Sequence, residues 1–480
     1  MSRVDRPSVP VPVWARLADV VTIVFLVLGA LVLAFGGFRL RFDTVRVSLM
    51  SPFRLLLVAV LVGVVRHALV RRAPIYARAL GGLAGAWRSE AFQVAWPLWM
   101  GSRLGVLAVG FMAVATIGYS TGVEPPFRVY PNELLNLPAR YDTGWYLTIA
   151  TDGYQWSPGQ TGEVNIAFLP ALPMLMRVGG RLMGDHPLLA GQIIVLVACL
   201  WAFVYVYRLA RDLTGDPDRA AVAVALLTAY PFAMFLGAVY TESLFLLAAA
   251  GGFYHAIRRQ PLQTAAFALL AGFGRPNGFL LSVPLGIVIL TPVLLPTWSA
   301  WRTWTMAKVM SAIREAWPTL LAAAAAVAGV VIYSAYIYSL TGRPLTWLEA
   351  HAAWGRTFSG VADFVIGPYH EMMNLGLYEF VRSNPVQAMN GLAAAFALVA
   401  VIPVTLRYGL AYGVFVLINV LPPLMAGGWL SIGRVTLGLF PLFVWLAEVI
   451  PARQRTGWLI AFATMQGFAA TLFYTWRTFI

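Results

Sequence analysis

The stretch PLLAGQIIVLVACLWAFVYVY, residues 187–207, decides the fold class, because its 21 residues include no charged side chain. A helix needs about 20 mostly apolar residues to cross a lipid bilayer. The whole chain of 480 residues is 60% hydrophobic and 11% charged, whereas a soluble domain has about 25% charged residues. Such a chain cannot cover a water-facing surface, so the sequence predicts an all-α polytopic membrane protein.

Thirteen stretches meet this criterion, and their short or broken members set the expected number of spans at 11–14. They are residues 14–37, 50–70, 93–118, 187–207, 220–238, 242–257, 261–274, 278–297, 318–340, 387–405, 409–426, 431–450 and 457–476. Prolines and glycines interrupt the region 220–297. Broken helices persist at membrane depth only where protein or a water-filled cavity supplies the lost hydrogen-bond partners.

The basic residues predict the orientation of these spans. The chain has 34 Lys and Arg against 20 Asp and Glu, a net charge of +14, and only one of the basic residues, Lys308, is a lysine. With a cytoplasmic N-terminus, 19 basic residues fall in cytoplasmic segments, 13 in external ones and two, Arg54 and Arg103, within spans. Basic residues concentrate in cytoplasmic loops and near anionic headgroups. The charge therefore indicates membrane topology and no nucleic-acid partner.

Several function classes are excluded by what the sequence lacks. It contains no Walker loop and no GxGxxG, HExxH, CxxC or GxSxG motif, and its five histidines show no metal-ligand spacing. The single cysteine, Cys199, excludes a disulfide framework and a cysteine-based metal site. A motor, a nucleotide-driven pump and a metalloprotease are therefore ruled out.

Two predicted external loops, residues 119–186 and 341–386, are long enough to carry function. Prolines among Tyr and Trp residues in the first loop predict an ordered segment with short helices at the membrane interface. Ionisable residues at the membrane boundary are functional candidates, because desolvating them is costly.

The densest cluster of such residues is RYDTGWYLTIATDGY, residues 140–154. A short helix beginning near Asp142 would place Trp145 and Tyr146 in the interface. Asp142 would then either act chemically or simply cap that helix. Asp152 precedes a glycine, an arrangement typical of a turn.

Two further segments carry one candidate each. In AYPFAMFLGAVYTESLF, residues 229–245, Glu242 falls in the first turn of a helix, where the helix dipole favours an acid. Capping explains this acid adequately, although its position at the base of an outer cavity leaves a functional role open. In GRPNG, residues 274–278, the guanidinium of Arg275 suits bidentate binding of a phosphate.

Arg434 completes the set, in LSIGRVTLGLFPLF, residues 430–443. It lies at the external end of a predicted span, where it either binds an anion or merely extends toward the headgroups. The predicted topology puts these acids and arginines, from four separate regions, on one side of the membrane. Their convergence predicts a functional site on that side.

These segments resemble the GPI mannosyltransferase II (PIG-V) family of polyprenyl-phosphate-sugar-dependent glycosyltransferases, which has the GT-C membrane fold. Residues 140–154 resemble the family's stretch (R/K)-W-D-x-x-x-Y-L-x-I-A-x-x-G-Y. AFLPALP, residues 167–173, resembles its F-F-P-L-x-P segment. Four more segments follow in the family's order, over roughly residues 140–445: those with Glu242, Arg275 and Arg434, and TGRPLTWLEAHAAWGR at 341–356.

The chain departs from the family pattern at two positions. Tyr141 stands where the family has Trp, and Val435 stands where Tyr is usual. These changes leave the fold intact and the identity of donor and acceptor open.

The resemblance implies transfer of a sugar, expected to be mannose, from a polyprenyl-phosphate donor to a lipid-linked glycan or other extracytoplasmic acceptor. It makes residues 91–450 a GT-C catalytic domain, with 1–90 as a two-helix membrane extension and 451–480 as a C-terminal transmembrane helix. The tilted helices of 166–297 would form a lateral groove for the prenyl chain. An arginine-rich composition suggests a bacterial inner membrane, with the active site facing the periplasm.

The residues fit this chemistry. A phosphodiester leaves as a stable anion, so one carboxylate base suffices, with attack from the opposite face and inversion at the anomeric carbon. The resemblance implies that Asp142 is this base and that the donor phosphate is held by Arg275, Arg434, Arg356 and His351. The expected substrate-binding residues are Arg140, Tyr141, Trp145, Tyr146, Asp152, Glu242 and Asn277. Arginine can neutralise the phosphate, so no cofactor is expected, although a divalent ion held by acids is compatible with the sequence.

Two alternatives stay open. A transporter or flippase for a lipid-linked sugar would use the same cavity and arginines, but it predicts midplane charges and a pseudo-symmetric repeat that the sequence does not clearly show. A GT-C transferase with another donor sugar, such as a pentose, fits the same motifs. Membrane lipids are expected partners, and the sequence leaves the oligomeric state open.

Overall fold

The computed structural model describes residues 12–35, 38–42, 45–49, 51–70, 74, 85–120, 125, 127–160, 162–294 and 305–477. Regular structure in these ranges is helical, as the sequence predicts, with one exception. The strands β1 (Phe38–Phe42) and β2 (Val45–Leu49) form an antiparallel pair that the all-α prediction missed. In FRLRF and VRVSL apolar residues alternate with polar or charged ones, and this period of two is typical of strands.

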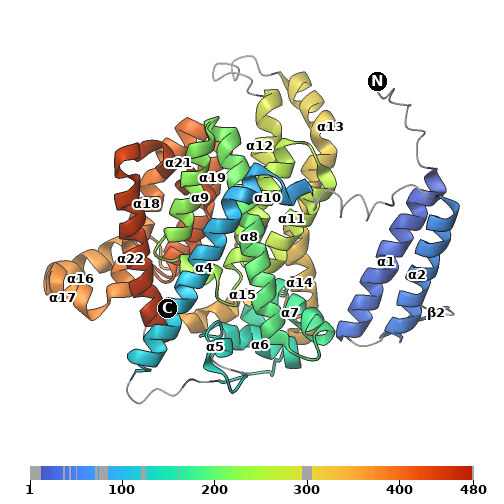
Figure 1. Cartoon of the computed structure of the whole chain (residues 1–480), viewed down its shortest axis with the longest axis horizontal. Coiled ribbons are helices and arrows are strands. Elements are labelled where there is room, and N and C mark those ends of the chain that lie inside the picture. Colours follow the sequence, from blue (N-terminus) through green and yellow to red (C-terminus); the bar gives the residue numbers. More distant parts are fainter. Residues whose placement is uncertain are drawn as a thin grey trace. The chain divides into compact units, whose positions relative to one another are not determined.

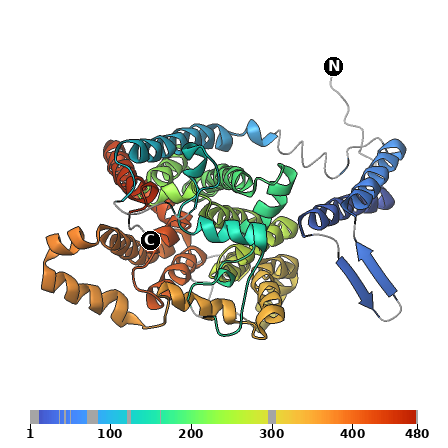
Figure 2. The same ribbon diagram turned by 90° about the horizontal axis from the view of Figure 1, so that it is seen from below.

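The chain divides into two compact units, the first made of residues 1–93 and 177–187 and the second of 94–176 and 188–480. In the first unit, α1 (Val13–Phe35) and α2 (Pro52–Leu69) lie side by side, and the two strands fall between them in the sequence (Figures 1 and 2). Asp19 and Arg66 form a buried ion pair that joins these helices, with 2.7 Å between Oδ1 and Nε.

The second unit is a bundle of helices and short helical turns, and α4 and α7 extend beyond its limits. Its earlier elements are α4 (Glu90–Thr116), α5 (Glu133–Asn136), α6 (Thr143–Asp152), η1 (Asn165–Ala167), α7 (Ala171–Leu182), α8 (Pro187–Thr214), α9 (Pro217–Ala229), η2 (Ala233–Leu236), α10 (Glu242–Ile257), α11 (Pro261–Gly274), η3 (Gly278–Leu281) and α12 (Ser282–Leu294). Its later elements are α13 (Met306–Ala323), α14 (Ala325–Thr341), α15 (Thr346–Glu349), η5 (Ala350–Trp354), η6 (Ala362–Ile366), α16 (Gly367–Leu375), α17 (Leu377–Ser383), α18 (Pro385–Tyr408), α19 (Leu410–Met425), α20 (Ile432–Leu437), α21 (Phe440–Val449), η7 (Ala452–Gln454) and α22 (Arg455–Tyr474).

Six helical stretches among the described residues are long and apolar enough to cross a membrane. They are Pro52–Leu69, Glu90–Thr116, Pro187–Thr214, Ile313–Thr341, Pro385–Tyr408 and Ala452–Tyr474. Shorter apolar helices cover Leu17–Leu26, Pro261–Gly274, Gly278–Thr291, Leu410–Met425 and Phe440–Val449. The predicted count of thirteen spans is not confirmed, and residues 36, 37, 50 and 295–297 of those spans lie outside the described residues.

Proline and glycine account for the spans that are shorter than the sequence predicts. Within 220–238, α9 ends at Ala229 and the 3₁₀ turn η2 follows Pro231. Within 431–450, α20 and α21 are separate helices, and Gly438 lies between them. Both residues end helices, because proline lacks a backbone donor and glycine gains little from helix formation.

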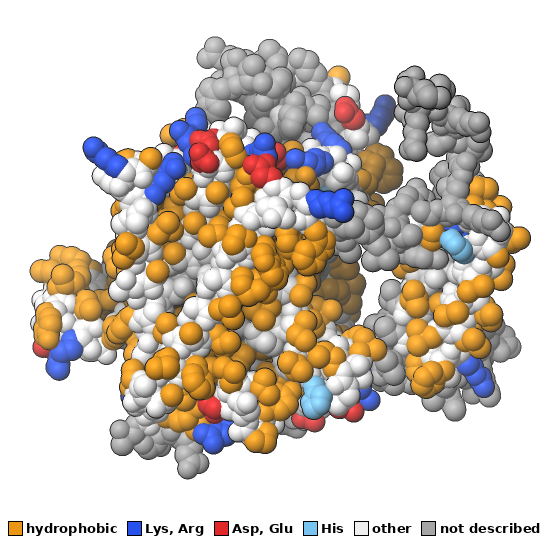
Figure 3. Space-filling view, in the orientation of Figure 1, with side chains coloured by type: hydrophobic (Ala, Val, Ile, Leu, Met, Phe, Trp, Pro, Cys, Tyr) orange, Lys and Arg blue, Asp and Glu red, His pale blue; other side chains and the backbone are white. Residues whose placement is uncertain are grey.

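On the face of the second unit seen in Figure 3, hydrophobic side chains are spread along the flank, and charged side chains gather toward the two ends. This distribution is the one that a bilayer requires, with apolar residues against lipid and charges near the headgroups. Together with the six long apolar helices, it indicates an integral membrane protein.

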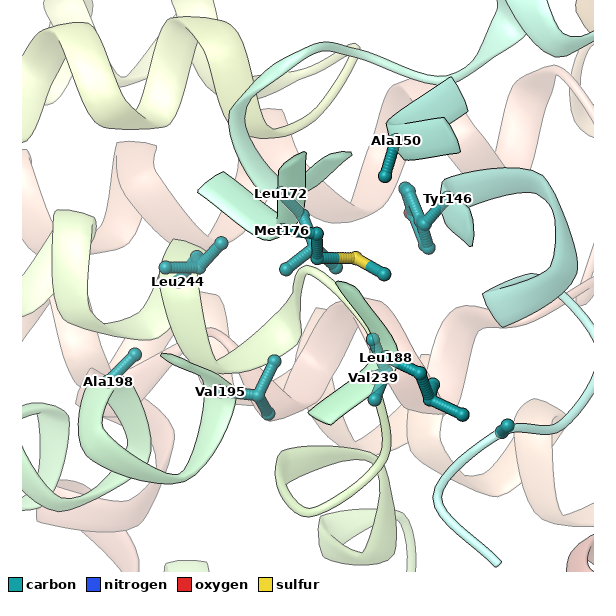
Figure 4. Packing of buried hydrophobic residues seen from close by; sticks show 10 residues of the cluster. Tyr146, Ala150, Leu172, Met176, Leu188, Val195, Ala198, Val239 and Leu244 are labelled. Atoms are coloured by element: carbon teal, nitrogen blue, oxygen red, sulfur yellow. The ribbon is translucent and has the colours of Figure 1, made fainter. Parts of the chain in front are cut away.

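Buried residues from three helices and one connecting segment fix the position of α6 in the second unit. Met176 and Leu172 of α7 lie between Tyr146 of α6 and Leu244 of α10 (Figure 4). Val195 and Ala198 of α8 and Val239, before α10, belong to the same cluster. Both predicted external loops contain short helices, as expected: α5 and α6 in the first, and α15, α16 and α17 in the second.

Candidate active site

Asp142, Glu242 and Arg434 form one ion-paired group, which we call the carboxylate–arginine group. Asp142 immediately precedes α6, Glu242 is the first residue of α10, and Arg434 lies in α20. Arg434 Nη1 is 2.9 Å from Asp142 Oδ2, and Arg434 Nε is 2.9 Å from Glu242 Oε1. One guanidinium therefore bridges two carboxylates that are far apart in the sequence.

Helix capping does not account for either acid. Asp142 occupies the N-cap position of α6, but its side chain makes no capping hydrogen bond. The N-cap of α10 is Thr241, which also makes none. The Glu242 side chain is fully buried, and its Oε2 has no hydrogen-bond partner among the residues that the structure describes. A buried ionised carboxylate requires charge pairing, which Arg434 supplies.

Two more arginines lie close to this group. Arg275 follows α11, and its Nη1 is 3.6 Å from Glu242 Oε1. Arg356 donates from Nη2 to the carbonyl oxygen of Leu430 over 3.0 Å. Burial, followed by the positive charges of Arg434 and Arg275, lowers the pKa of Arg356 to about 10. Counted by formal charge, these three arginines and two carboxylates leave one net positive charge.

Aromatic rings cover the guanidinium of Arg434. Its Cζ lies 4.6 Å from the ring centroid of Tyr240 and 4.9 Å from that of Phe235. Cations are attracted to aromatic faces in this range of distances. The rings also keep water from the guanidinium, whose side chain is only 11% exposed. Water therefore screens its charge only weakly.

The hydroxyl of Tyr240 holds the turn that carries Asp142. It donates to the carbonyl oxygen of Arg140 and accepts from the backbone N–H of Asp142, both over 3.1 Å. Between them, Tyr141 has a φ of 45°, which is uncommon for a residue with a side chain. Strain of this kind persists only where neighbouring contacts impose it. The turn is therefore rigid, and it directs the Asp142 side chain toward Arg434.

Trp145 and Tyr146 line the start of α6. The ring of Trp145 lies 5.8 Å from those of Phe168 and Trp354, centroid to centroid. Tyr146 is buried, with its ring 6.4 Å from that of Tyr240. Both rings thus pack against aromatic neighbours at the start of α6, and Tyr146 lies in the buried cluster and not at the interface that the sequence predicts.

Three other predicted substrate-binding residues have contacts away from the carboxylate–arginine group. Arg140 is buried and pairs with Glu133 over 2.9 Å. The Tyr141 hydroxyl donates to the carbonyl oxygen of Arg477 over 2.7 Å, and burial raises the pKa of this hydroxyl to about 12. Asp152 is the last residue of α6 and is exposed. The structure does not bring these three side chains to the group.

Asn277 and His351 also have partners of their own. Asn277 Nδ2 donates to Asn419 Oδ1 over 2.7 Å. His351 Nδ1 donates to the carbonyl oxygen of Trp347 over 2.9 Å, and burial lowers the pKa of the imidazole. His351 is therefore neutral at pH 7 and adds no charge for a phosphate.

The sequence does not single out three residues that support the site. Tyr240 and Phe235 bracket Arg434, and they stand inside the quoted segment that contains Glu242. Asn390 of α18 accepts at Oδ1 from the backbone N–H of Gly433 over 2.8 Å. A lone asparagine in the apolar stretch of α18 is the signal that could have identified it, because a buried amide needs partners.

No group of three or more His, Cys, Asp or Glu side chains in the described part of the chain is placed to hold a metal ion. Asp142 and Glu242 are instead bonded to Arg434.

Comparisons with known proteins assign the chain to a family. No curated protein matches it in sequence. Among solved structures, it is similar to the archaeal oligosaccharyltransferase AglB from Archaeoglobus fulgidus in complex with an inhibitory peptide and a dolichol-phosphate. The two share 13% sequence identity and a TM-score of 0.36 over 78% of this chain, which spans 55% of that protein's length. The sequence profile of the mannosyltransferase (PIG-V) family matches residues 124–383, more than half of the chain, so the protein belongs to this family of glycosyltransferases.

Proposed function

We propose that the protein transfers mannose from a polyprenyl-phosphate donor to a lipid-linked glycan or other extracytoplasmic acceptor, within a GT-C architecture. The observation that carries this proposal is the carboxylate–arginine group of Asp142, Glu242 and Arg434, with Arg275 and Arg356 beside it. It offers a carboxylate and surplus positive charge in one secluded place. A reaction that expels a phosphate and deprotonates a hydroxyl needs both.

In the proposed reaction, the acceptor hydroxyl gives its proton to Asp142 while its oxygen bonds to the anomeric carbon. The bond from that carbon to the phosphate oxygen breaks, and its electron pair leaves with polyprenyl phosphate. Attack comes from the face opposite the phosphate, so the configuration inverts. The arginines neutralise the leaving phosphate, and because they are already held in place they need not reorganise. No general acid and no metal are required.

Arg434 would couple donor binding to the base. Its Nη1 is bonded to Asp142 Oδ2 in the structure. A donor phosphate that binds Arg434 competes for this N–H, and the carboxylate oxygen of Asp142 then becomes available to the acceptor hydroxyl. This would favour ionisation of the acceptor only when the donor is bound.

The proposed location is a bacterial inner membrane, with the active site facing the periplasm. It rests on the predicted division of basic residues into 19 cytoplasmic and 13 external. Labelling of single introduced cysteines in the loops 119–186 and 341–386 by a membrane-impermeant reagent tests it. If the reagent labels these cysteines only after the cells are lysed, the loops face the cytoplasm and the proposed orientation is wrong.

The proposal is tested by incubating the purified protein with a polyprenyl-phosphate mannose and an acceptor lipid. We expect release of polyprenyl phosphate and, by NMR, a product with inverted anomeric configuration. Asp142→Asn should lower kcat by about 10²- to 10⁴-fold, the usual contribution of a general base. Glu163→Gln, in the same loop and exposed, is the matched control and should keep wild-type turnover.

Two results would contradict this assignment. Wild-type turnover in a folded Asp142→Asn variant would show that Asp142 is not the general base. Movement of the lipid-linked sugar across the membrane with the phosphodiester intact would favour the flippase alternative.

A further inference from the structure

An apolar cavity of about 320 Å³ lies between the η6–α16 segment and α18. Its volume is within the range of about 300–1,000 Å³ that is typical of small-molecule pockets. Phe364 and Met372 line one side, Ala395 and Leu398 line the other, and Trp429 contributes from the loop before α20. None of the lining residues is charged, so the cavity suits a hydrocarbon chain.

One wall of this cavity is bonded to the backbone that carries Arg434. Gly391 lines the cavity, and its neighbour Asn390 accepts a hydrogen bond from Gly433, the residue before Arg434. The bond lengths along this path place Gly391 within about 16 Å of Arg434, Cα to Cα. The cavity and the carboxylate–arginine group are therefore close enough for one extended ligand to reach both.

A second connection runs through Trp429. The next residue, Leu430, accepts a hydrogen bond from the guanidinium of Arg356. The backbone N–H groups of Ser359 and Gly360 donate to the carbonyl oxygen of Met425, over 3.0 and 3.2 Å. The loop that carries Arg356 is thereby held against the loop that carries Trp429. A cationic group thus adjoins the cavity lining.

The η6–α16 wall of the cavity belongs to a group of helices at the edge of the second unit. Figures 1 and 2 show α16 and α17 projecting from the side of the bundle. Their outer surface carries exposed apolar side chains, among them Met373, Leu377 and Tyr378. In an integral membrane protein such a surface lies against lipid. Such a surface would allow a lipid ligand to approach the cavity from the membrane.

We propose that this cavity holds the first isoprene units of the donor's polyprenyl chain, with the donor phosphate on Arg356 and Arg434. This inference rests on the proposed function. The phosphodiester of a polyprenyl-phosphate sugar carries one negative charge, which matches the one net positive charge of the three arginines and two carboxylates. The site differs from the groove that the sequence predicts within 166–297. A phospholipid such as phosphatidylglycerol also carries one phosphodiester charge, so competition between the two lipids belongs to the test.

Filling the cavity is the first test. Ala395→Phe adds a ring to an exposed position of the cavity wall, and Leu392→Phe adds the same ring on the same helix outside the lining. With a polyprenyl-phosphate mannose as substrate, Ala395→Phe should raise KM about tenfold and leave kcat within about twofold. Leu392→Phe should match wild type. Met372→Trp fills the cavity from the opposite wall and should also raise KM. Equal KM values in all four proteins would overturn the proposal.

Crosslinking is the second test, and it does not depend on activity. The probe is a diazirine-bearing farnesyl phosphate without sugar, used on the purified full-length protein. We expect labelled peptides within 364–372 and 391–398, and loss of this labelling in Ala395→Phe. Labelling within 166–297, or competition by phosphatidylglycerol equal to that by farnesyl phosphate, would overturn the proposal. If the protein labels as expected but transfers no sugar from any prenyl-phosphate donor, the proposed function fails and the cavity assignment stands.

Discussion

Two clusters in the helical bundle each join one glutamate to arginines, and they differ in how fully the carboxylate is bonded. At Glu448, Arg407 donates over 3.0 Å to each carboxylate oxygen. Arg219 donates over 3.2 Å, and the Tyr408 hydroxyl donates over 2.6 Å. Both oxygens of Glu448 are therefore bonded, whereas Glu242 Oε2 has no partner among the described residues.

The clusters also differ in exposure. The side chains of Arg407 and Arg219 are 59% and 38% exposed, and those of Arg434 and Arg275 are 11% and 13% exposed. Exposed ion pairs contribute little, because water and salt screen them. Secluded charges act strongly on an incoming anion. An incompletely bonded and secluded cluster is thus suited to bind a ligand, whereas a fully bonded carboxylate with exposed arginines is suited to hold helices together.

The same helix reaches both clusters. Asn390 of α18 bonds to the backbone beside Arg434, and Arg407, near the end of α18, bonds to Glu448. The 17 residue steps from Asn390 to Arg407 rise about 26 Å along a helix, close to the ~30 Å thickness of the hydrocarbon layer. The two clusters therefore fall near opposite faces of a bilayer.

The largest difference in activity between the two clusters should come from replacing the arginine that makes two hydrogen bonds to carboxylate oxygens in each cluster. Arg434→Lys removes the fork that bridges Asp142 and Glu242 and should lower kcat/KM for the donor by roughly 10- to 100-fold, the value of one or two charged hydrogen bonds. Arg407→Lys, in the other cluster, should stay within about twofold of wild type, because the Arg407 side chain is 59% exposed and Glu448 keeps Arg219 and Tyr408 as partners. Steady-state kinetics on both variants measures this difference. Equal losses would mean that both clusters only brace the fold.

A smaller effect is expected at Arg275, which lies 3.6 Å from Glu242 and is not hydrogen-bonded to it. Arg275→Gln should raise the donor KM about five- to tenfold with little change in kcat, the result of losing binding that is equal in ground and transition states. Arg219→Gln, the matched change beside Glu448, should leave KM unchanged. A fall in kcat without a rise in KM would move Arg275 from phosphate binding to the chemical step.

The sequence predicts the membrane class and most of the charged site, and its failures have physical causes. Asp142, Glu242, Arg275 and Arg434 were identifiable because charges are scarce in this chain and costly at a membrane boundary. Their mutual pairing was not predictable, because it depends on how four helices pack.

Other features required tertiary information. The count of thirteen spans treated apolar stretches as whole helices, while Pro231 and Gly438 divide two of them. The support from Tyr240 and Asn390 comes from contacts between residues 43 or more apart in the chain. Arg140 looked like a site residue by motif, yet its guanidinium serves Glu133 and nearby backbone carbonyls.

Replacing Glu448 should change the stability of the protein and leave its activity nearly unchanged. Glu448→Gln removes the carboxylate that joins α9, α18 and α21, so we expect a Tm lower by a few degrees and sugar transfer within about twofold of wild type. Thermal unfolding of the detergent-purified protein, followed by tryptophan fluorescence, measures the shift. A Glu448→Gln protein with normal Tm and impaired transfer would place function at this cluster instead.

The smallest effect is expected at His351. The pH dependence of stability at this residue shows how far the region shielded from water extends from the carboxylate–arginine group into the loop 341–386. Burial lowers the pKa of this imidazole, and the charge of Arg356 acts in the same direction. The unfolded chain therefore takes up a proton more readily than the folded one, so stability should fall as the pH falls through about 6.5. His351→Gln keeps a donor for the Trp347 carbonyl without titrating, and its Tm should fall about 1–2 °C less than that of wild type between pH 7.5 and 5.0. Since His351 is neutral above this range, the donor KM should be constant between pH 7 and 8. An identical pH dependence of Tm in both proteins would show that water reaches the imidazole, and the secluded region would then end before this loop.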